Sequence, residues 1–143
     1  MIVWINGAAG SGKTTLAREL SLNLWTRKIR NVWLDGDAVR SWLTPDCTYS
    51  DPDREKHLQR VWVVAKMVQV VGGIVVCSFV GLPPARANYH IYLTGRERHP
   101  PWEGTEWPKP QRPDLVLDTG QKAISECLKE ILELLPFGSP FTS

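Results

Sequence analysis

Hydrophobic and polar positions alternate along the chain in blocks that predict strands and helices in turn. Short apolar runs of strand length lie at 1–5, 31–34, 74–79, 89–93 and 114–117. Apolar residues at helical spacing predict helices over 13–28, 53–71 and 122–135, with a short helical turn at 39–43. This alternation predicts an α/β fold: a parallel five-stranded sheet with helices on both faces.

Residues 80–88 connect two predicted parallel strands without room for a normal crossover helix. Fully extended, this segment spans roughly 30 Å, enough to run back along a strand and step sideways. We therefore expect an extended crossover here. The polar, proline-rich stretches 44–53 and 95–113 predict loops, and 136–143 predicts a flexible tail of a single domain, 1–143.

A glycine-rich turn with the pattern G-x-x-x-x-G-K-[ST] follows the first strand and precedes the first helix. Its backbone N–H groups and the helix N-terminus suit the phosphates of ATP. The lysine ammonium would reach the β- and γ-phosphates, and the Thr14 hydroxyl would bind Mg²⁺. The expected ATP-binding residues of this P-loop NTPase-type fold are Gly7, Ala8, Ala9, Gly10, Ser11, Gly12, Lys13, Thr14 and Thr15.

Two carboxylates, Asp35 and Asp37, end the second strand, at the edge where open α/β sheets bind ligands. They would serve the waters of Mg²⁺ or an acceptor hydroxyl, or else they simply cap a turn. Ser78 ends the third strand, where GTPases and many ATPases carry a metal-associated aspartate. No Asn-Lys-x-Asp motif for guanine is present. These features favour a kinase over a GTPase or a motor.

Four segments together carry a resemblance to a known family. They are Leu-Asp-Gly-Asp-Ala-Val-Arg at 34–40, Tyr-Ser-Asp-Pro-Asp-Arg at 49–54, Ser-Phe at 78–79 and Asp-Leu-Val-Leu-Asp-Thr at 114–119. The joint pattern closely resembles adenylyl-sulfate (APS) kinases, well over 1–81 and less closely over 114–135. The resemblance implies catalytic roles for Asp37 at the acceptor hydroxyl, for Lys13, and for Asp35, which with Thr14 would organise the metal.

The resemblance also implies an acceptor-binding set. Arg40 and Arg54 would hold acceptor anions, unless they form ordinary surface ion pairs. Tyr49 takes the place of a phenylalanine that stacks on the acceptor's adenine, or it packs the loop. His57 stands where the family has a substrate-contacting asparagine, and Ser78 and Phe79 complete the acceptor-binding set.

Residues 82–113 depart from the family because they replace a longer region with an Arg-Asp-x-x-Gly-Leu-Tyr lid. Arg96 and Arg98 are the basic pair left for a shortened lid, where they would act on the transferring phosphate or the adenine, or else they form a solvated charge pair on the loop. An open acceptor side would suit a bulky substrate, such as hydroxymethylated DNA. In that hypothesis a stacking and phosphate-binding surface forms from residues that otherwise pack the loop onto the sheet: Trp102, Trp107, Lys109 and Arg112.

Composition narrows these hypotheses only a little. The net charge of +2 and the 43% hydrophobic share call for neither a nucleic acid nor a membrane as partner. Three widely spaced cysteines argue against a disulfide framework and favour the cytoplasm. We expect an ATP- and Mg²⁺-dependent kinase acting on APS; the alternatives are a kinase for a nucleotide or modified-DNA hydroxyl, and a nucleotide-binding module with little catalysis. The resemblance also implies a homodimer.

Overall fold

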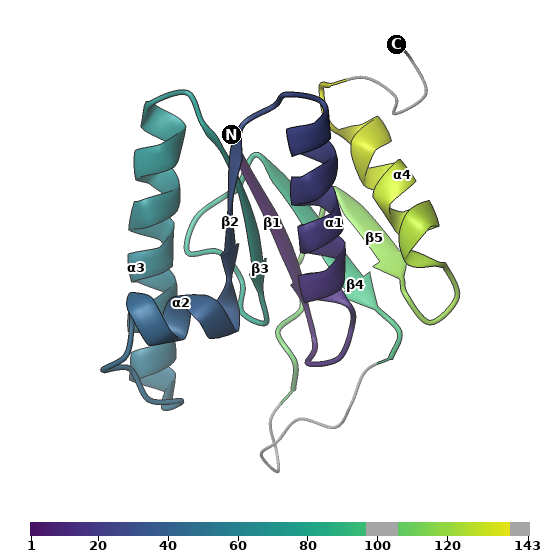
Figure 1. Cartoon of the computed structure of the whole chain (residues 1–143). Helices are drawn as coiled ribbons and strands as arrows, with labels where there is room; N and C mark the ends of the chain where they lie inside the picture. The colour runs from purple at the N-terminus through teal and green to yellow at the C-terminus, as the bar shows by residue number, and fades with distance from the viewer. Residues whose placement is uncertain (97–105, 138–143) are drawn as a thin grey trace.

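The computed structural model describes residues 1–96 and 106–137, which form five strands and four helices (Figure 1). The strands are β1 (Ile2–Gly7), β2 (Asn31–Asp35), β3 (Ile74–Phe79), β4 (Tyr89–Thr94) and β5 (Leu115–Asp118). The helices are α1 (Lys13–Thr26), α2 (Gly36–Trp42), α3 (Asp51–Val70) and α4 (Ile124–Leu134). Every strand and helix predicted from the sequence is confirmed within this part of the chain.

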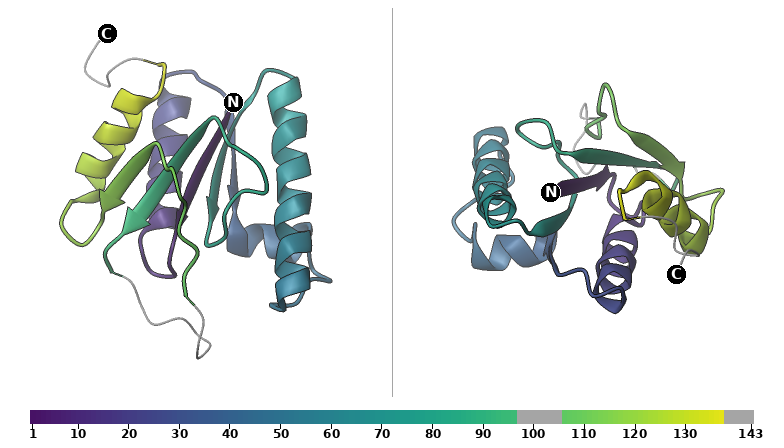
Figure 2. Two further views of the ribbon diagram at one scale, coloured as in Figure 1. Left: turned by 180° about the vertical axis from the view of Figure 1, so that it is seen from behind. Right: turned by 90° about the horizontal axis from the view of Figure 1, so that it is seen from above.

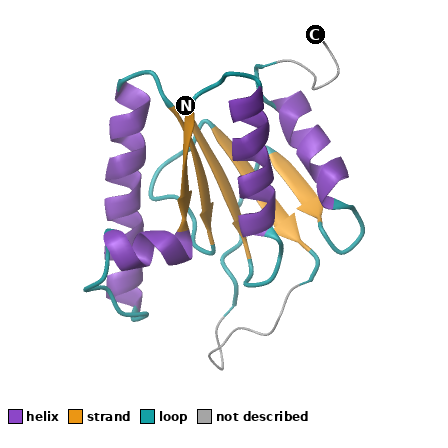
Figure 3. Cartoon of the chain, in the orientation of Figure 1, coloured by secondary structure: helices purple, strands orange, loops and turns teal. Residues whose placement is uncertain are grey.

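The five strands form one parallel sheet in the order β2-β3-β1-β4-β5 (Figure 3). All strand arrows point the same way, so their carboxyl ends share one edge with the glycine-rich turn. Asp35 pairs in register with Ser78, and Asn6 pairs with Phe79. The predicted fold class is confirmed, and the register brings the candidate carboxylates and Ser78 to this edge.

Two apolar cores lie on opposite faces of the sheet, because successive residues of β1 point to alternate sides. Val3 and Ile5 face a core closed by α1 and α4. Ile2 and Trp4 face a second core closed by α2 and α3. The two views of Figure 2 show α1 beside α4 and α2 beside α3.

Residues 80–88 form the extended crossover predicted from the sequence, with neither helix nor strand. The segment runs back along β1 on the side of the second core. The indole Nε1 of Trp4 donates to the carbonyl oxygen of Gly81 at 3.0 Å, and the backbone N–H of Ile2 donates to Asn88 Oδ1 at 2.7 Å. Hydrogen bonds to β1 thus replace the packing that a crossover helix would give.

The predicted starts of α2 and α3 and the predicted tail need correction. Helix α2 begins at Gly36, directly after β2, and not at residue 39. Helix α3 begins at Asp51 because Ser50 caps it, its hydroxyl accepting from the Asp53 N–H at 3.4 Å. The predicted tail is anchored at Phe137, whose carbonyl accepts from Arg27 Nη2 at 2.6 Å; residues 138–143 lie outside the described part.

No described helix is long and apolar enough to cross a lipid bilayer.

Candidate active site

The glycine-rich turn forms a tight loop between β1 and α1. Gly10 and Gly12 adopt φ values of 81° and 95°, in the left-handed region that side chains disfavour. The buried hydroxyl of Thr119, directly after β5, donates to the carbonyl oxygen of Ser11 at 2.6 Å and also to that of Thr94 at 3.1 Å. The loop is therefore held both by its own backbone geometry and by the ends of β4 and β5.

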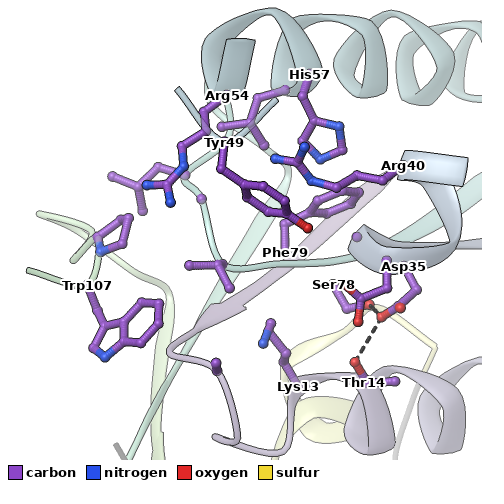
Figure 4. A pocket seen from close by; sticks show the side chains of 18 of the residues that line it. Lys13, Thr14, Asp35, Arg40, Tyr49, Arg54, His57, Ser78, Phe79 and Trp107 are labelled. Atoms are coloured by element: carbon purple, nitrogen blue, oxygen red, sulfur yellow. Dashed lines mark hydrogen bonds between the residues drawn. The ribbon is translucent and has the colours of Figure 1, made fainter. Parts of the chain in front are cut away.

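A cavity of about 690 Å³ opens at the carboxyl edge of the sheet, beside this loop (Figure 4). Its walls come from the loop, the β2–α2 junction, the start of α3, the end of β3 with the crossover, and the segment after residue 105. The lining residues of the loop are Ala9, Gly10, Lys13 and Thr14; the others include Asp35, Asp37, Arg40, Tyr49, Arg54, His57, Ser78, Phe79 and Trp107. One cavity thus joins the predicted phosphate and acceptor residues.

The loop end of the cavity suits a phosphate-bound divalent cation. The Thr14 hydroxyl donates to Asp35 Oδ1 at 2.9 Å, which places two hard oxygen groups side by side. No cluster of three or more His, Cys, Asp or Glu side chains suited to a metal occurs in residues 1–96 and 106–137. The Thr14 hydroxyl and the Asp35 carboxylate together fit Mg²⁺, which is commonly held by one or two carboxylates together with substrate phosphates.

Lys13 supplies the positive charge at the same end. Its Nζ lies 3.4 Å from the carbonyl oxygen of Ala8. Burial lowers the pKa of Lys13, and the nearby Asp35 and Asp37 partly offset that effect. A half-buried ammonium between two carboxylates and the loop is suited to neutralise a phosphoryl group in transfer.

Arg40 and Tyr49 form a pair at the acceptor end. The guanidinium carbon of Arg40 lies 4.1 Å from the centroid of the Tyr49 ring, in cation–π geometry. Its Nη1 also donates to the carbonyl oxygens of Cys47 and Thr48, each at 3.3 Å. The loop before α3 thus fixes the guanidinium in the cavity wall with its ring partner.

His57 is buried behind this pair. Its Nδ1 lies 2.7 Å from the hydroxyl oxygen of Thr44, which is also buried. This bond pairs the two buried groups with each other, and the tautomer of the ring decides which of them donates. Burial, and secondarily the charge of Arg40, lowers the pKa of His57 to about 4. The imidazole is therefore neutral at physiological pH.

Trp107 also lines the cavity, and it comes from the region 82–113 that the sequence predicts to be shortened (Figure 4). The neighbouring carbonyl of Pro108 accepts from Asn6 Nδ2 at 3.2 Å. Asn6 Oδ1 lies 2.7 Å from His90 Nε2, and because an amide oxygen only accepts, His90 donates. Asn6, fully buried at the end of β1, thus ties the Trp107 segment to the sheet.

Most predicted site residues meet in this cavity, but several do not. Gly7 at the end of β1 and Ala8 and Ser11 in the loop are buried, and Gly12 and Thr15 lie at the start of α1 away from the lining. Arg96, Lys109 and Arg112 are exposed and outside the cavity lining. Arg98 and Trp102 lie outside the described residues.

Sequence reasoning missed one hydrogen-bonded residue beside the site and gave another an incomplete role. Trp33 Nε1 donates to Ser78 Oγ at 2.9 Å, and Ser78 Oγ donates to Asp35 Oδ1 at 2.8 Å. Ser78 therefore donates to a carboxylate and also lines the cavity, and its predicted contact with the acceptor stays a prediction. Alternation along β2, which puts residues 33 and 35 on one side, was the available signal.

The parallel sheet, the P-loop and a cavity with paired carboxylates define an ATP-dependent P-loop kinase that phosphorylates a hydroxyl group. A family model for adenylylsulphate kinase matches residues 1–95. The chain belongs to the adenylylsulphate kinase family.

Relatives and solved structures agree with this assignment. The adenylyl-sulfate kinase of Prochlorococcus marinus is 30% identical over 166 residues, covering 94% of this chain and 83% of the relative. The APS kinase CysC of Mycobacterium tuberculosis superposes with a TM-score of 0.72 at 26% identity, over 93% of this chain and 94% of that one. The hexameric APS kinase of Thiobacillus denitrificans gives 0.69 at 27% identity, over 92% of this chain and 27% of that one.

The same comparisons show that this chain departs from the family. The alignment with the Prochlorococcus enzyme spans 166 positions, more than the 143 residues of this chain, so this chain is shorter within the aligned region. The family match itself ends at residue 95, next to the start of the segment that is not described. The first finding agrees with a shortened chain, and the second ends the family match inside the region 82–113 that the sequence predicts to be shortened.

Proposed function

We propose that the chain transfers the γ-phosphoryl group of ATP to a hydroxyl of adenylyl sulfate. The observation that carries this proposal is the single cavity that runs from the P-loop to Arg40, Tyr49 and Arg54. A phosphoryl donor and a small anionic acceptor can therefore meet without leaving the protein. The comparisons give no support to hydroxymethylated DNA as the acceptor.

At the donor end, the P-loop N–H groups and Lys13 hold the triphosphate, and Thr14 with Asp35 holds Mg²⁺. The cation, when bound, neutralises charge on the phosphate oxygens and aligns them for transfer. Lys13 balances the remaining negative charge at the transferring group. These residues position and stabilise the phosphoryl group, and they form no covalent bond with it.

At the acceptor end, Asp37 lies in the cavity wall close to the P-loop and is proposed to orient the attacking hydroxyl and accept its proton. Arg40 and Arg54 are proposed to hold the anionic groups of the acceptor. Tyr49 and Trp107 both line the cavity, and their rings are proposed to stack on the flat base of the acceptor. Two aromatic rings in the cavity favour an acceptor with a flat base, such as an adenine nucleotide, over a sugar without a base.

A transfer assay with labelled ATP and Mg²⁺ tests the proposal. Adenylyl sulfate, other adenine nucleotides and hydroxymethylated duplex DNA would be compared as acceptors at equal concentration. We expect transfer to adenylyl sulfate, and a fall in kcat of about 10²- to 10⁴-fold in the isosteric Asp37→Asn variant. ATP binding without transfer to any of these acceptors would refute the kinase proposal and favour a binding module.

We also propose that the chain forms a homodimer. The outer face of α3 exposes Val63, Met67 and Val70, whose exposed fractions are 57%, 65% and 82%. Apolar side chains exposed along one helix are typical of a face that another chain covers. Light scattering after gel filtration would show a dimer for the wild type and a monomer for Met67→Glu; a wild-type monomer would refute the proposal.

The proposed location is the cytoplasm. Cys47, Cys77 and Cys127 are all free thiols, as is usual in a reducing compartment.

A further inference from the structure

Trp33 has no part in the motifs of the sequence, yet it is bonded to the site. It lies on β2 two residues before Asp35, so both side chains lie on the same side of the strand. Its indole Nε1 donates to Ser78 Oγ at 2.9 Å. An indole N–H can only donate, so the Ser78 oxygen is the acceptor in this bond.

Ser78 is hydrogen-bonded in turn to the carboxylate of Asp35. Its side chain is 1% exposed, and its hydroxyl donates to Asp35 Oδ1 at 2.8 Å. A serine hydroxyl carries one proton, and a carboxylate oxygen can only accept. The bond from Trp33 therefore occupies a lone pair of Ser78 and leaves its proton pointing at Asp35. The paired register of Asp35 and Ser78 keeps the two residues adjacent.

Thr14 completes the chain of hydrogen bonds from the opposite side. Its hydroxyl donates to the same Oδ1 atom at 2.9 Å, which leaves the lone pairs of Thr14 available to a cation. Among residues 1–96 and 106–137, Asp35 Oδ2 has no hydrogen-bond partner. Two donors thus fix one oxygen of the carboxylate, and the other remains open to the waters of a metal.

We infer that Trp33 and Ser78 are positioning residues that orient Asp35 and Thr14 for the Mg²⁺ of bound ATP. Ser78 acts through Asp35 and does not contact the acceptor. Partners of this kind typically change metal affinity by about 10- to 100-fold. The inference rests on the proposed function in one respect, the binding of Mg²⁺ by Asp35 and Thr14.

The test measures binding of a non-hydrolysable ATP analogue by calorimetry across a range of Mg²⁺ concentrations, which needs no turnover. We expect Ser78→Ala to raise the Mg²⁺ concentration for half-maximal effect about tenfold. Trp33→Phe keeps an aromatic ring without the N–H and should raise it about three- to fivefold. Ser78→Cys, with a weak S–H donor of similar size, should fall between wild type and Ser78→Ala.

Two controls separate hydrogen bonding from packing. Trp62→Phe removes a half-buried indole of α3 that is not hydrogen-bonded to this chain of residues, and it should leave the Mg²⁺ dependence unchanged. The double variant Trp33→Phe/Ser78→Ala should equal Ser78→Ala alone, because Trp33 acts only through Ser78. Thermal unfolding of every variant would show that the fold is retained.

Each result decides the inference. Additive effects in the double variant, or unchanged Mg²⁺ dependence in Ser78→Ala, would overturn it. A raised KM for adenylyl sulfate in Ser78→Ala with normal Mg²⁺ dependence would overturn it in favour of direct acceptor contact. ATP binding by the wild type that is indifferent to Mg²⁺ would overturn the metal role itself. The expected Mg²⁺ shifts in a protein without transfer activity would support the inference while refuting the proposed kinase reaction.

Discussion

The phosphate end of the cavity is built from one continuous turn of chain, whereas its acceptor end is assembled from segments far apart in the sequence. Backbone geometry at Gly10 and Gly12 shapes the first. The second depends on α2, α3, the crossover and the Trp107 segment meeting in space. A site built from one turn keeps its chemistry when distant segments change, while an assembled wall can be altered one segment at a time. The shortened region of this chain contributes Trp107 to the acceptor end of the cavity and leaves the P-loop unchanged.

The largest effect is expected at the phosphate end. Lys13→Ala removes the ammonium from the P-loop and should lower kcat/KM by about 10³-fold or more, because transfer depends on charge neutralisation. Lys28→Ala, just beyond the far end of α1, is the matched control and should leave transfer unchanged. A loss below about tenfold in Lys13→Ala would show that the P-loop does not dominate the reaction.

His57 tests the acceptor end through acid stability. Its pKa is lowered to about 4, below the ordinary value of 6.5, so the unfolded chain binds the proton more readily. Stability should therefore fall as pH drops from 6.5 to 4, by about 1 to 3 kcal/mol from this residue. Urea unfolding of His57→Asn should show a correspondingly smaller fall. Equal pH profiles for the two proteins would contradict the buried neutral imidazole.

Trp107 tests whether the shortened segment supplies part of the acceptor wall. Trp107→Ala should raise the KM for adenylyl sulfate about tenfold with little change in the KM for ATP, since stacking on one base contributes about 1 to 3 kcal/mol. Trp42→Ala is the control, because Trp42 is 75% exposed and outside the cavity lining. Equal changes in both KM values would indicate loss of structure and not loss of an acceptor contact.

The smallest effect is expected at His90, which is linked to the Trp107 segment only through Asn6. His90→Ala leaves Asn6 Oδ1 without its donor, loosens the anchor beside Trp107, and should raise the acceptor KM about two- to fivefold. His90→Gln retains an N–H donor and should restore part of the affinity. Steady-state kinetics of His90→Ala/Trp107→Ala should match those of Trp107→Ala. A further loss in the double variant would show that His90 acts by another route.

The sequence predicts the local features of this molecule well. The P-loop follows from consecutive residues, and the extended crossover follows from the short distance between two apolar runs. The starts of α2 and α3 were missed by three and two residues, because Gly36 resembles a turn and the Ser50 cap involves hydrogen bonds that no apolar periodicity reports.

Pairings across the sheet could not be predicted in the same way. Ser78 was placed against the acceptor because its position matched a family motif, whereas its bond to Asp35 depends on the register of β2 with β3. Trp107 was left between packing and DNA binding, since nothing near it in the sequence shows that Asn6 holds its segment. The single-domain boundary at 1–143 stays a prediction.

The bonds from Thr119 to Ser11 and to Thr94 have a consequence for local unfolding. Strand β5 is four residues long and lies at the edge of the sheet, where strands open most readily. When β5 detaches from the sheet, the Thr119 hydroxyl no longer donates to Ser11. The P-loop then loses this support although none of its own residues has changed. Amide hydrogen exchange in the loop should therefore be limited by the opening of β5, so that the rigidity of the nucleotide cradle is set at the opposite end of the chain.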